Sequence, residues 1–222
     1  MVVEIKIPNP RLAGTLHSFA KSLLGSHFSM KDLGAVNSSL GMDVSQEPGG
    51  VSLSLPRYLS KVLSHFNMSD CNPITDPLSP GFDLISFAPN EQFLDTSAYR
   101  SMVGKLLFAS NTVRPDLPYA VSVLSCYIKD PKEVHMKAAK QVLRYVKGTL
   151  DAALVYRSVG SFQLIGYCDA NWANDESDRA SNTGYVFKLS DSPISRRSKK
   201  HATMAQSSIE AEYLDTFFIV IL

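Results

Sequence analysis

Residues 164–172 read Leu-Ile-Gly-Tyr-Cys-Asp-Ala-Asn-Trp, a short and largely apolar run that ends close to Asp169. Runs of this length are typical of buried strands. Residues 207–213, Ser-Ser-Ile-Glu-Ala-Glu-Tyr, follow later in the chain and are predicted to be helical. An aspartate at a strand end and a glutamate on a following helix can share a divalent cation. The two segments therefore predict a Mg²⁺ site suited to phosphodiester cleavage.

Two glutamates compete for the helical position in this predicted site. Glu210 and Glu212 are two residues apart, so their side chains point to different sides of a helix and at most one would meet Asp169. The pattern by itself leaves that choice open. It also leaves open a purely structural role, because acidic residues are common in turns and on helix surfaces.

The composition is that of a globular protein without a strong overall charge. Of the 222 residues, 45% are hydrophobic and 19% are charged, which suits one large domain or two small ones. The net charge is +1, so the composition does not predict a nucleic-acid-binding protein. Any such role has to come from local patches.

The cysteines and the two ends of the chain bear on the cellular compartment. Cys71, Cys126 and Cys168 are odd in number and lack metal-ligand spacing, which favours an intracellular, reduced compartment, with cytoplasm, nucleus and organelle not distinguished. Residues 1–10 show no signal-peptide pattern. The apolar run at 217–222 is far shorter than the roughly 20 residues that span a bilayer. No membrane association is expected.

The N-terminal part is expected to contain a helix, a hairpin, a second helix and a linker. Helical spacing of apolar residues after Asn9-Pro10 predicts a capped amphipathic helix. Alternating residues at 40–46 and 51–55, on either side of Glu-Pro-Gly-Gly at 47–50, predict a β-hairpin, and Pro56 is expected to open a short helix. Prolines without periodicity predict a linker or surface crossing at 71–95.

Three helices are expected next, at 98–110, 115–127 and 131–147. Asp130-Pro131-Lys132-Glu133 is predicted to form a capping box at the start of the third helix, and Gly148 is placed to end it. Beyond this point the periodicity becomes extended and predicts short strands at 153–156, 162–168, 184–189 and 194–197. The patterns predict an α+β fold with a domain boundary near residue 150.

The helix expected at 131–147 carries a cationic stripe opposite an apolar one. Lys137, Lys140, Arg144 and Lys147 are three or four residues apart and share one face. Such a stripe suits a phosphate backbone, although a solvated helix face has the same pattern. A second basic cluster, at 196–201, separates the last predicted strand from the final helix.

Several longer motifs occur in a fixed order. Residues 28–34 read Phe-Ser-Met-Lys-Asp-Leu-Gly, followed by Leu-Gly-Met at 40–42; residues 99–108 read Tyr-Arg-Ser-Met-Val-Gly-Lys-Leu-Leu-Phe; and residues 114–116 read Arg-Pro-Asp, followed by Ala-Val at 120–121 and Leu-Ser at 124–125. Residues 142–149 read Val-Leu-Arg-Tyr-Val-Lys-Gly-Thr. Residues 166–173 read Gly-Tyr-Cys-Asp-Ala-Asn-Trp-Ala, and residues 179–187 read Arg-Ala-Ser-Asn-Thr-Gly-Tyr-Val-Phe. In this order, together with 207–213, the motifs resemble those of Ty1/copia-type retrotransposon Pol polyproteins.

This resemblance covers nearly the whole chain from about Phe28. It implies a remnant of the reverse transcriptase palm and thumb at 1–95, a helical thumb or connection region at 96–150, and an incomplete RNase H-like mixed α/β domain at 151–222. Asp169 would match the first RNase H carboxylate, and Glu212 fits the helical glutamate better than Glu210. The implied cofactor is Mg²⁺, and the implied partner is an RNA–DNA hybrid or another nucleic acid.

The chain also departs from the pattern of that family. No Tyr-Val-Asp-Asp run, which supplies carboxylates for polymerisation, occurs in the sequence. The third RNase H aspartate would follow the final helix, beyond Leu222. The family's Ile-Ser-Trp-x-Ser-Lys reads Ile-Ser-Arg-Arg-Ser-Lys at 194–199, which puts Arg196 at a position that is normally aromatic.

Three hypotheses follow from the sequence. The first is a fragment of a copia-type Pol protein that is inactive by itself, with the remaining Pol segments supplied in trans. The second is a non-catalytic module that binds nucleic acid through the cationic stripe. The third is a pseudogene-like product without a selected role, in which an incomplete sheet leaves an edge strand unpaired.

Overall fold

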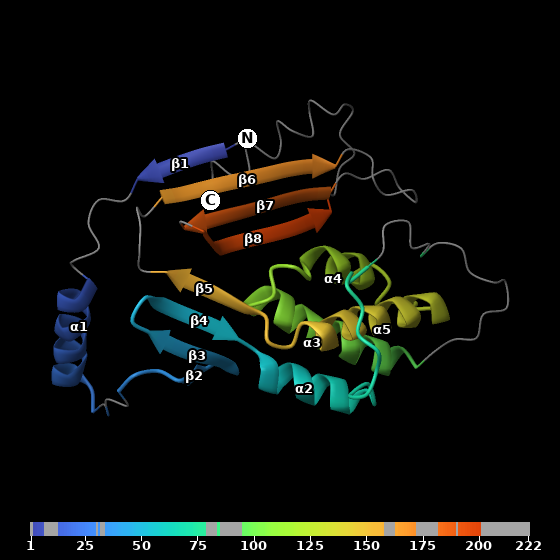
Figure 1. Cartoon of the computed structure of the whole chain (residues 1–222), viewed down its shortest axis with the longest axis horizontal. Helices are drawn as coiled ribbons and strands as arrows, with labels where there is room; N and C mark the ends of the chain where they lie inside the picture. Colours follow the sequence, from blue (N-terminus) through green and yellow to red (C-terminus); the bar gives the residue numbers. More distant parts are fainter. Residues whose placement is uncertain are drawn as a thin grey trace.

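The computed structural model describes residues 2–6, 13–29, 31, 34–78, 84, 95–157, 163–171, 182–189 and 191–200. Helices and antiparallel sheets make this part of the chain an α+β structure (Figure 1). In chain order the elements are β1 (Val2–Lys6), α1 (Ala13–His27), β2 (Ser38–Ser39), β3 (Met42–Glu47), β4 (Gly50–Ser54), α2 (Pro56–His65), α3 (Thr96–Thr112), α4 (Pro118–Ser125), α5 (Glu133–Gly148), β5 (Ala153–Arg157), β6 (Gln163–Asn171), β7 (Asn182–Leu189) and β8 (Ser192–Lys200).

The hydrophobic core lies among α2, α3, α4 and α5, which pack together in Figure 1. Apolar residues recur every three or four positions, so each helix has one buried side. On α3 the buried side includes Val103 and Leu106, and on α5 it includes Val142 and Val146. The buried hydroxyl of Tyr99 donates to the carbonyl of Leu124 at 2.8 Å and joins α3 to α4.

The first sheet contains the hairpin expected from the sequence. Its strand order is β2-β3-β4-β5, and β3 and β4 are joined by a tight turn at Glu47–Gly50. The strand that follows the expected domain boundary also belongs to this sheet, because β5 pairs antiparallel with β4 and places Tyr156 opposite Val51. The expected domain ranges stay a prediction, but this pairing ties residues 153–157 to the N-terminal sheet.

The second sheet has the order β1-β6-β7-β8, with every neighbouring pair antiparallel. Three strands consecutive in the sequence, β6, β7 and β8, form a meander with a register shift at Phe187/Lys188. The N-terminal strand β1 pairs with the other side of β6 and places Glu4 opposite Ile165. β6 is therefore an inner strand of this sheet, and β1 and β8 are its outer strands.

Polar contacts join the second sheet to the rest of the described chain. The hydroxyl of Tyr156 in β5 donates to the carbonyl of Pro193 in β8 at 2.8 Å, and the hydroxyl of Ser192 donates to the carbonyl of Val155. Arg196 in β8 reaches the last turn of α3. These contacts fix one side of β8 against β5 and the helices.

The start of α5 differs from the expected capping box. The helix begins at Glu133, so Lys132 is the N-cap and its backbone N–H donates to Nδ1 of His135 at 2.8 Å. The imidazole, three residues beyond the cap, takes the role expected for a glutamate. Asp130 instead pairs with the ammonium of Lys132 at 3.1 Å.

The other expected helices and strands agree with the structure to within a few residues, with two exceptions. Most of the linker expected at 71–95 lies outside the described residues. The helix expected at 115–127 is the shorter α4, because Arg114, Pro115 and Asp116 form a turn before it. The predicted cap at Asn9-Pro10 and the predicted final helix from Ser207 lie outside the described residues. None of the described helices is both long and apolar enough to cross a membrane.

Candidate functional site

Only one member of the predicted metal pair lies in the described chain. Asp169 is in β6, where its backbone is opposite Gly184 of β7. Glu212 and the alternative Glu210 lie outside the described residues. In the described part of the chain, no three His, Cys, Asp or Glu side chains gather as a metal site would need. The pairing of Asp169 with Glu212 stays a prediction.

The cationic stripe lies on α5 as the sequence predicts, but its four members differ in their contacts. Lys137 and Lys140 are exposed, and Lys147 is partly exposed. Arg144 donates from Nε to the carbonyl of Asn72 at 2.8 Å, which holds the segment after α2 against α5. The opposite side of α5 is buried. The stripe therefore consists of three lysines toward solvent and one arginine with a structural contact.

A buried guanidinium brings two of the sequence motifs together. Arg114, from the Arg-Pro-Asp motif, is 1% exposed and donates to the carboxylate of Asp116, with Nη2 2.6 Å from Oδ2. It also donates to Thr149, from the Lys-Gly-Thr motif, with Nη2 2.6 Å from Oγ1. The ring of Tyr145 lies 5.5 Å from the guanidinium carbon. Polar residues of both motifs thus form one network that connects the end of α3 to the end of α5.

The charge of this network changes the acid strength of its carboxyl group. Partial burial by itself would raise the pKa of Asp116, but the hydrogen bond and charge of Arg114, helped by a hydrogen bond from Tyr145, lower it overall. Burial and the same carboxylate raise the pKa of Tyr145. Asp116 is therefore held ionised as the counter-ion of Arg114, which is a structural role.

His135 is a second buried polar residue with a structural role. Its Nδ1 accepts from the backbone of Lys132, and its Nε2 lies 3.0 Å from the carbonyl of Leu84. A neutral imidazole that carries its proton on Nε2 satisfies both contacts. The ring also stacks on Tyr127 at a centroid distance of 3.9 Å. His135 therefore fastens part of the expected linker to the start of α5.

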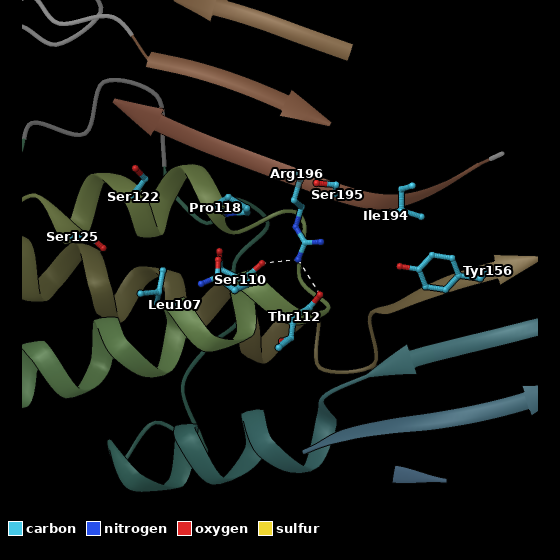
Figure 2. A pocket seen from close by; sticks show the side chains of 11 residues that line it. Leu107, Ser110, Thr112, Pro118, Ser122, Ser125, Tyr156, Ile194, Ser195 and Arg196 are labelled. Carbon is cyan, nitrogen blue, oxygen red and sulfur yellow. Dashed lines mark hydrogen bonds between the residues drawn. The ribbon is translucent and has the colours of Figure 1, made fainter. Parts of the chain in front are cut away.

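A cavity that the sequence did not predict lies between α3, α4, β5 and β8 (Figure 2). Its volume is about 610 Å³, and hydroxyl groups, including those of Ser122 and Ser195, line much of it. The side chain of Arg196 reaches from β8 to the end of α3, where Nη2 donates to the carbonyls of Ser110 at 2.6 Å and Thr112 at 3.1 Å. The only sequence signal for this cavity was the arginine at a normally aromatic position.

Of the second basic cluster, the structure describes the side chain of Arg196 alone. That side chain points inward to the carbonyl end of a helix, where a cation is favoured by the helix dipole. The side chains of Arg197, Lys199 and Lys200, and all of His201, lie outside what is described.

Comparison with known proteins links this chain to a family. Residues 12–80 match the family described as reverse transcriptase (RNA-dependent DNA polymerase). The chain is 37% identical over 190 residues to an uncharacterized mitochondrial protein of Arabidopsis thaliana, a match that spans 86% of this chain and 78% of the relative. It is 37% identical over 190 residues to the retrovirus-related Pol polyprotein from transposon RE1 of the same plant, a match that spans 86% of this chain.

The chain belongs to the copia-type retrotransposon Pol family. A putative transposon Ty5-1 protein of Saccharomyces cerevisiae is 34% identical over 212 residues, which are 95% of this chain and 67% of that protein. The chain spans only 13% of the RE1 polyprotein and is a fragment relative to it. No solved structure matches the chain. The family assignment confirms the resemblance read from the ordered motifs.

Within this copia-type chain, the Arg114 network explains two of those motifs. The motif positions Arg114, Asp116, Tyr145 and Thr149 meet in one partly buried network of polar contacts. The sequence does not predict this contact, because nothing local to either motif specifies contact across 35 residues.

Proposed function

We propose that this copia-type Pol fragment binds RNA–DNA hybrids through the lysine face of α5, defined as Lys137, Lys140 and Lys147. The observation that carries the proposal is that Lys137 and Lys140 are exposed on a helix whose opposite side is buried in the core. The helix therefore holds its charges in a fixed orientation. Lys137 and Lys147 are ten positions apart, which is about 15 Å of helix and enough to contact several phosphates of one strand.

Electrostatics supports a local rather than a global binding surface. The chain as a whole carries a net charge of +1, so long-range attraction of a polyanion is weak. In the described part of the chain, none of the three lysines forms an ion pair with a carboxylate. Contacts of unpaired lysines with phosphates release counterions, which makes the binding depend steeply on salt.

A matched pair of double variants tests this proposal. Fluorescence anisotropy with a labelled RNA–DNA hybrid should show that Lys137→Glu/Lys140→Glu weakens binding. It should also make the dependence of log K on log salt less steep by about two units. The control Lys31→Glu/Lys61→Glu makes the same charge change at exposed positions outside α5 and should bind almost as the unaltered protein does. Equal affinity and equal salt dependence for the α5 variant would contradict the proposal.

We further propose that residues 163–200 correspond to the first strands of an RNase H-like domain. Support comes from the meander β6-β7-β8 and from Asp169 in β6, the strand that the resemblance expects to carry the first carboxylate. Asp169 and Glu212 would hold Mg²⁺, which supplies charge neutralisation and an activated water. Reverse transcriptases in general use divalent metals.

By itself, the 222-residue chain is proposed to bind hybrids without cutting them. The resemblance calls for more carboxylates than Asp169 and Glu212, and the sequence holds no Tyr-Val-Asp-Asp run for polymerisation. A cleavage assay on an RNA–DNA hybrid with Mg²⁺ should therefore give no product. Robust cleavage that disappears in Asp169→Asn would overturn the inactivity and support the metal site.

Spectroscopy can test the metal ligands without cleavage. Titration with Mg²⁺ should shift the backbone amide signal of Asp169, and the shift should be lost in Glu212→Gln but kept in Glu210→Gln. The reverse result would assign the helical ligand to Glu210. No shift with any variant would remove the metal from the proposal.

The remaining Pol segments are proposed as partners in trans. Helix α1 and the residue after it carry large exposed apolar side chains, among them Phe19 at 64% and Phe28 at 63% exposed. Exposed apolar side chains of this size are typical of surfaces that a protein partner covers. Co-expression with the polymerase segment of a copia-type Pol protein should yield a complex that Phe19→Glu weakens. If Phe19→Glu leaves the complex unchanged, α1 is not the contact.

The cellular location is proposed to be an intracellular, reduced compartment. Cys71 and Cys126 are free, which fits that environment. Thiol labelling in intact cells should modify the exposed Cys126 without prior reduction. Resistance to labelling until a reductant is added would contradict the assignment.

A further inference from the structure

The cavity between α3, α4, β5 and β8 contains a cation without a carboxylate partner. In the part of the chain that the structure describes, the ion pairs are Arg57 with Asp43, Arg114 with Asp116, and Lys132 with Asp130. Arg196 is not among them, and the described groups that it binds are two neutral carbonyls, through Nη2. The carbonyl end of α3 and the nearby Asp116 stabilise this half-buried charge in part, and an anion in the cavity would stabilise it further.

The hydrogen-bonding capacity of Arg196 is also incompletely used. Its Nε is buried and has no hydrogen-bond partner among the described residues, and no described residue accepts from Nη1. Burial lowers the pKa of Arg196, whereas the nearby Tyr156 and Asp116 act in the opposite direction. The two contacts of Nη2 hold the guanidinium in place at the wall of the cavity, as the dashed lines in Figure 2 show.

The rest of the cavity wall suits an oxyanion. Ser122 on α4, Ser195 on β8 and Asn111 on α3 also line the cavity, and their side chains carry hydrogen-bond donors. The volume of about 610 Å³ is in the range of small-molecule sites. Planar guanidinium groups pair well with the tetrahedral oxygens of phosphate.

We propose that this cavity binds a phosphate group, with the guanidinium of Arg196 as its cation and the hydroxyls of Ser122 and Ser195 as neutral donors. The resemblance to the family expects an aromatic residue at position 196. A broad aromatic ring would occupy space that the narrower arginine side chain leaves open. The phosphate site is separate from the lysine face of α5 and does not depend on hybrid binding there.

The experiment follows the Nε–H signal of Arg196 by nuclear magnetic resonance during titration with inorganic phosphate. A saturable shift is expected, whereas chloride at equal ionic strength should cause none. Arg196→Gln should weaken phosphate binding by at least about tenfold, because a charge-assisted hydrogen bond is lost. Arg196→Trp, which restores the aromatic residue, should remove binding.

Two further variants keep the test independent of folding defects. Ser122→Ala should keep the fold and weaken phosphate binding by about three- to tenfold, since one neutral hydrogen bond is lost. Arg100→Gln is the matched control, because Arg100 also donates to a backbone carbonyl, at 3.1 Å, but lies outside the cavity. Its phosphate affinity should be unchanged.

The outcomes test whether the cavity binds phosphate and identify the source of that phosphate. Equal shifts with phosphate and chloride, or unchanged affinity in both Arg196→Gln and Ser122→Ala, would overturn it. A parallel titration with single-stranded tetra-thymidylate separates a phosphodiester from free phosphate. A response to both probes supports a nucleic-acid strand as the source, and a response to phosphate alone supports a free phosphate or nucleotide. The Lys137→Glu/Lys140→Glu variant should bind phosphate normally even if hybrid binding is lost.

Discussion

The guanidinium of Arg114 donates to both the hydroxyl and the backbone carbonyl of Thr149, with Nη2 2.6 Å from Oγ1 and Nη1 3.2 Å from the carbonyl oxygen. Thr149 is also the C-cap residue of α5, and its hydroxyl donates to the carbonyl of Tyr145 at 2.9 Å. One buried arginine thus satisfies groups at the end of α5 and anchors the turn after α3. Because buried polar groups destabilise a protein when their partners are removed, the network makes clear predictions.

Replacement of the arginine tests the network directly. Arg114→Met should lower the free energy of unfolding by about 3 kcal/mol, because it removes a buried cation and leaves the groups of Thr149 without donors. Denaturant unfolding followed by circular dichroism measures the change. Arg100→Met removes a single hydrogen bond from an exposed arginine and should cost less than about 1 kcal/mol. Similar losses for the two variants would contradict the role of the network.

The stability of the chain should depend on pH through Asp116. The pKa of its carboxyl group is lowered in the folded state from an ordinary value of 3.8. A lowered pKa means that the stabilisation is fully present above the unfolded-state value and is lost as the pH falls through the folded-state value. Thermal unfolding should therefore show Asp116→Asn to be less stable than the unaltered protein near neutral pH. The difference should shrink below about pH 4. A difference that stays constant down to about pH 2 would contradict the ionised pairing.

Adjacent glycines in the β3–β4 turn should differ in how much stability they lose on the same substitution. A Cβ atom added at Gly50 would overlap the backbone carbonyl of Tyr156, whereas one added at Gly49 would have nothing within 4 Å. Gly50→Ala should therefore destabilise the chain by about 2 kcal/mol through overpacking between β4 and β5. Gly49→Ala should change stability by less than about 1 kcal/mol. Equal effects on the unfolding midpoint would mean that β5 does not pair with β4.

Loss of the imidazole at position 135 should loosen the start of α5. His135→Ala removes the acceptor for the backbone N–H of Lys132 and the partner of the Leu84 carbonyl. We expect a loss of about 2–4 kcal/mol and faster hydrogen exchange at the amide of Lys132. His65→Ala, at an exposed position of α2, is the matched control and should leave both measurements nearly unchanged. Unaltered exchange at Lys132 in His135→Ala would contradict this form of capping.

Local sequence patterns predicted most of the secondary structure. The β3–β4 hairpin and the helices α2 to α5 follow from alternation, helical spacing and proline placement, which depend on near neighbours. The start of α5 was placed wrongly because Pro131 and Glu133 satisfied the local capping pattern. In the folded chain, the buried His135 supplies the backbone acceptor instead. Packing against Tyr127 holds that ring in place, and a capping pattern does not include such contacts.

One of the two candidate sites could be predicted from the sequence, and the other could not. The lysine face of α5 could be predicted, because residues three and four apart share a helix side. The cavity around Arg196 could not, because Arg196 meets carbonyls 86 and 84 residues away in the sequence. Nothing near residue 196 specifies those partners. The pairing of β5 with β4 likewise joins segments that the sequence assigned to different domains.

The sequence by itself determined membership in the copia-type Pol family and the succession of helices and strands, because ordered motifs and residue periodicity are properties of the linear chain. Only the tertiary structure decided that the buried Arg114 donates to Thr149. It also decided that Arg196 donates to a carbonyl at the end of α3 beside a polar cavity. The physical reason is that such contacts depend on which surfaces pack together. Packing is set by the whole hydrophobic core rather than by the residues on either side of each motif.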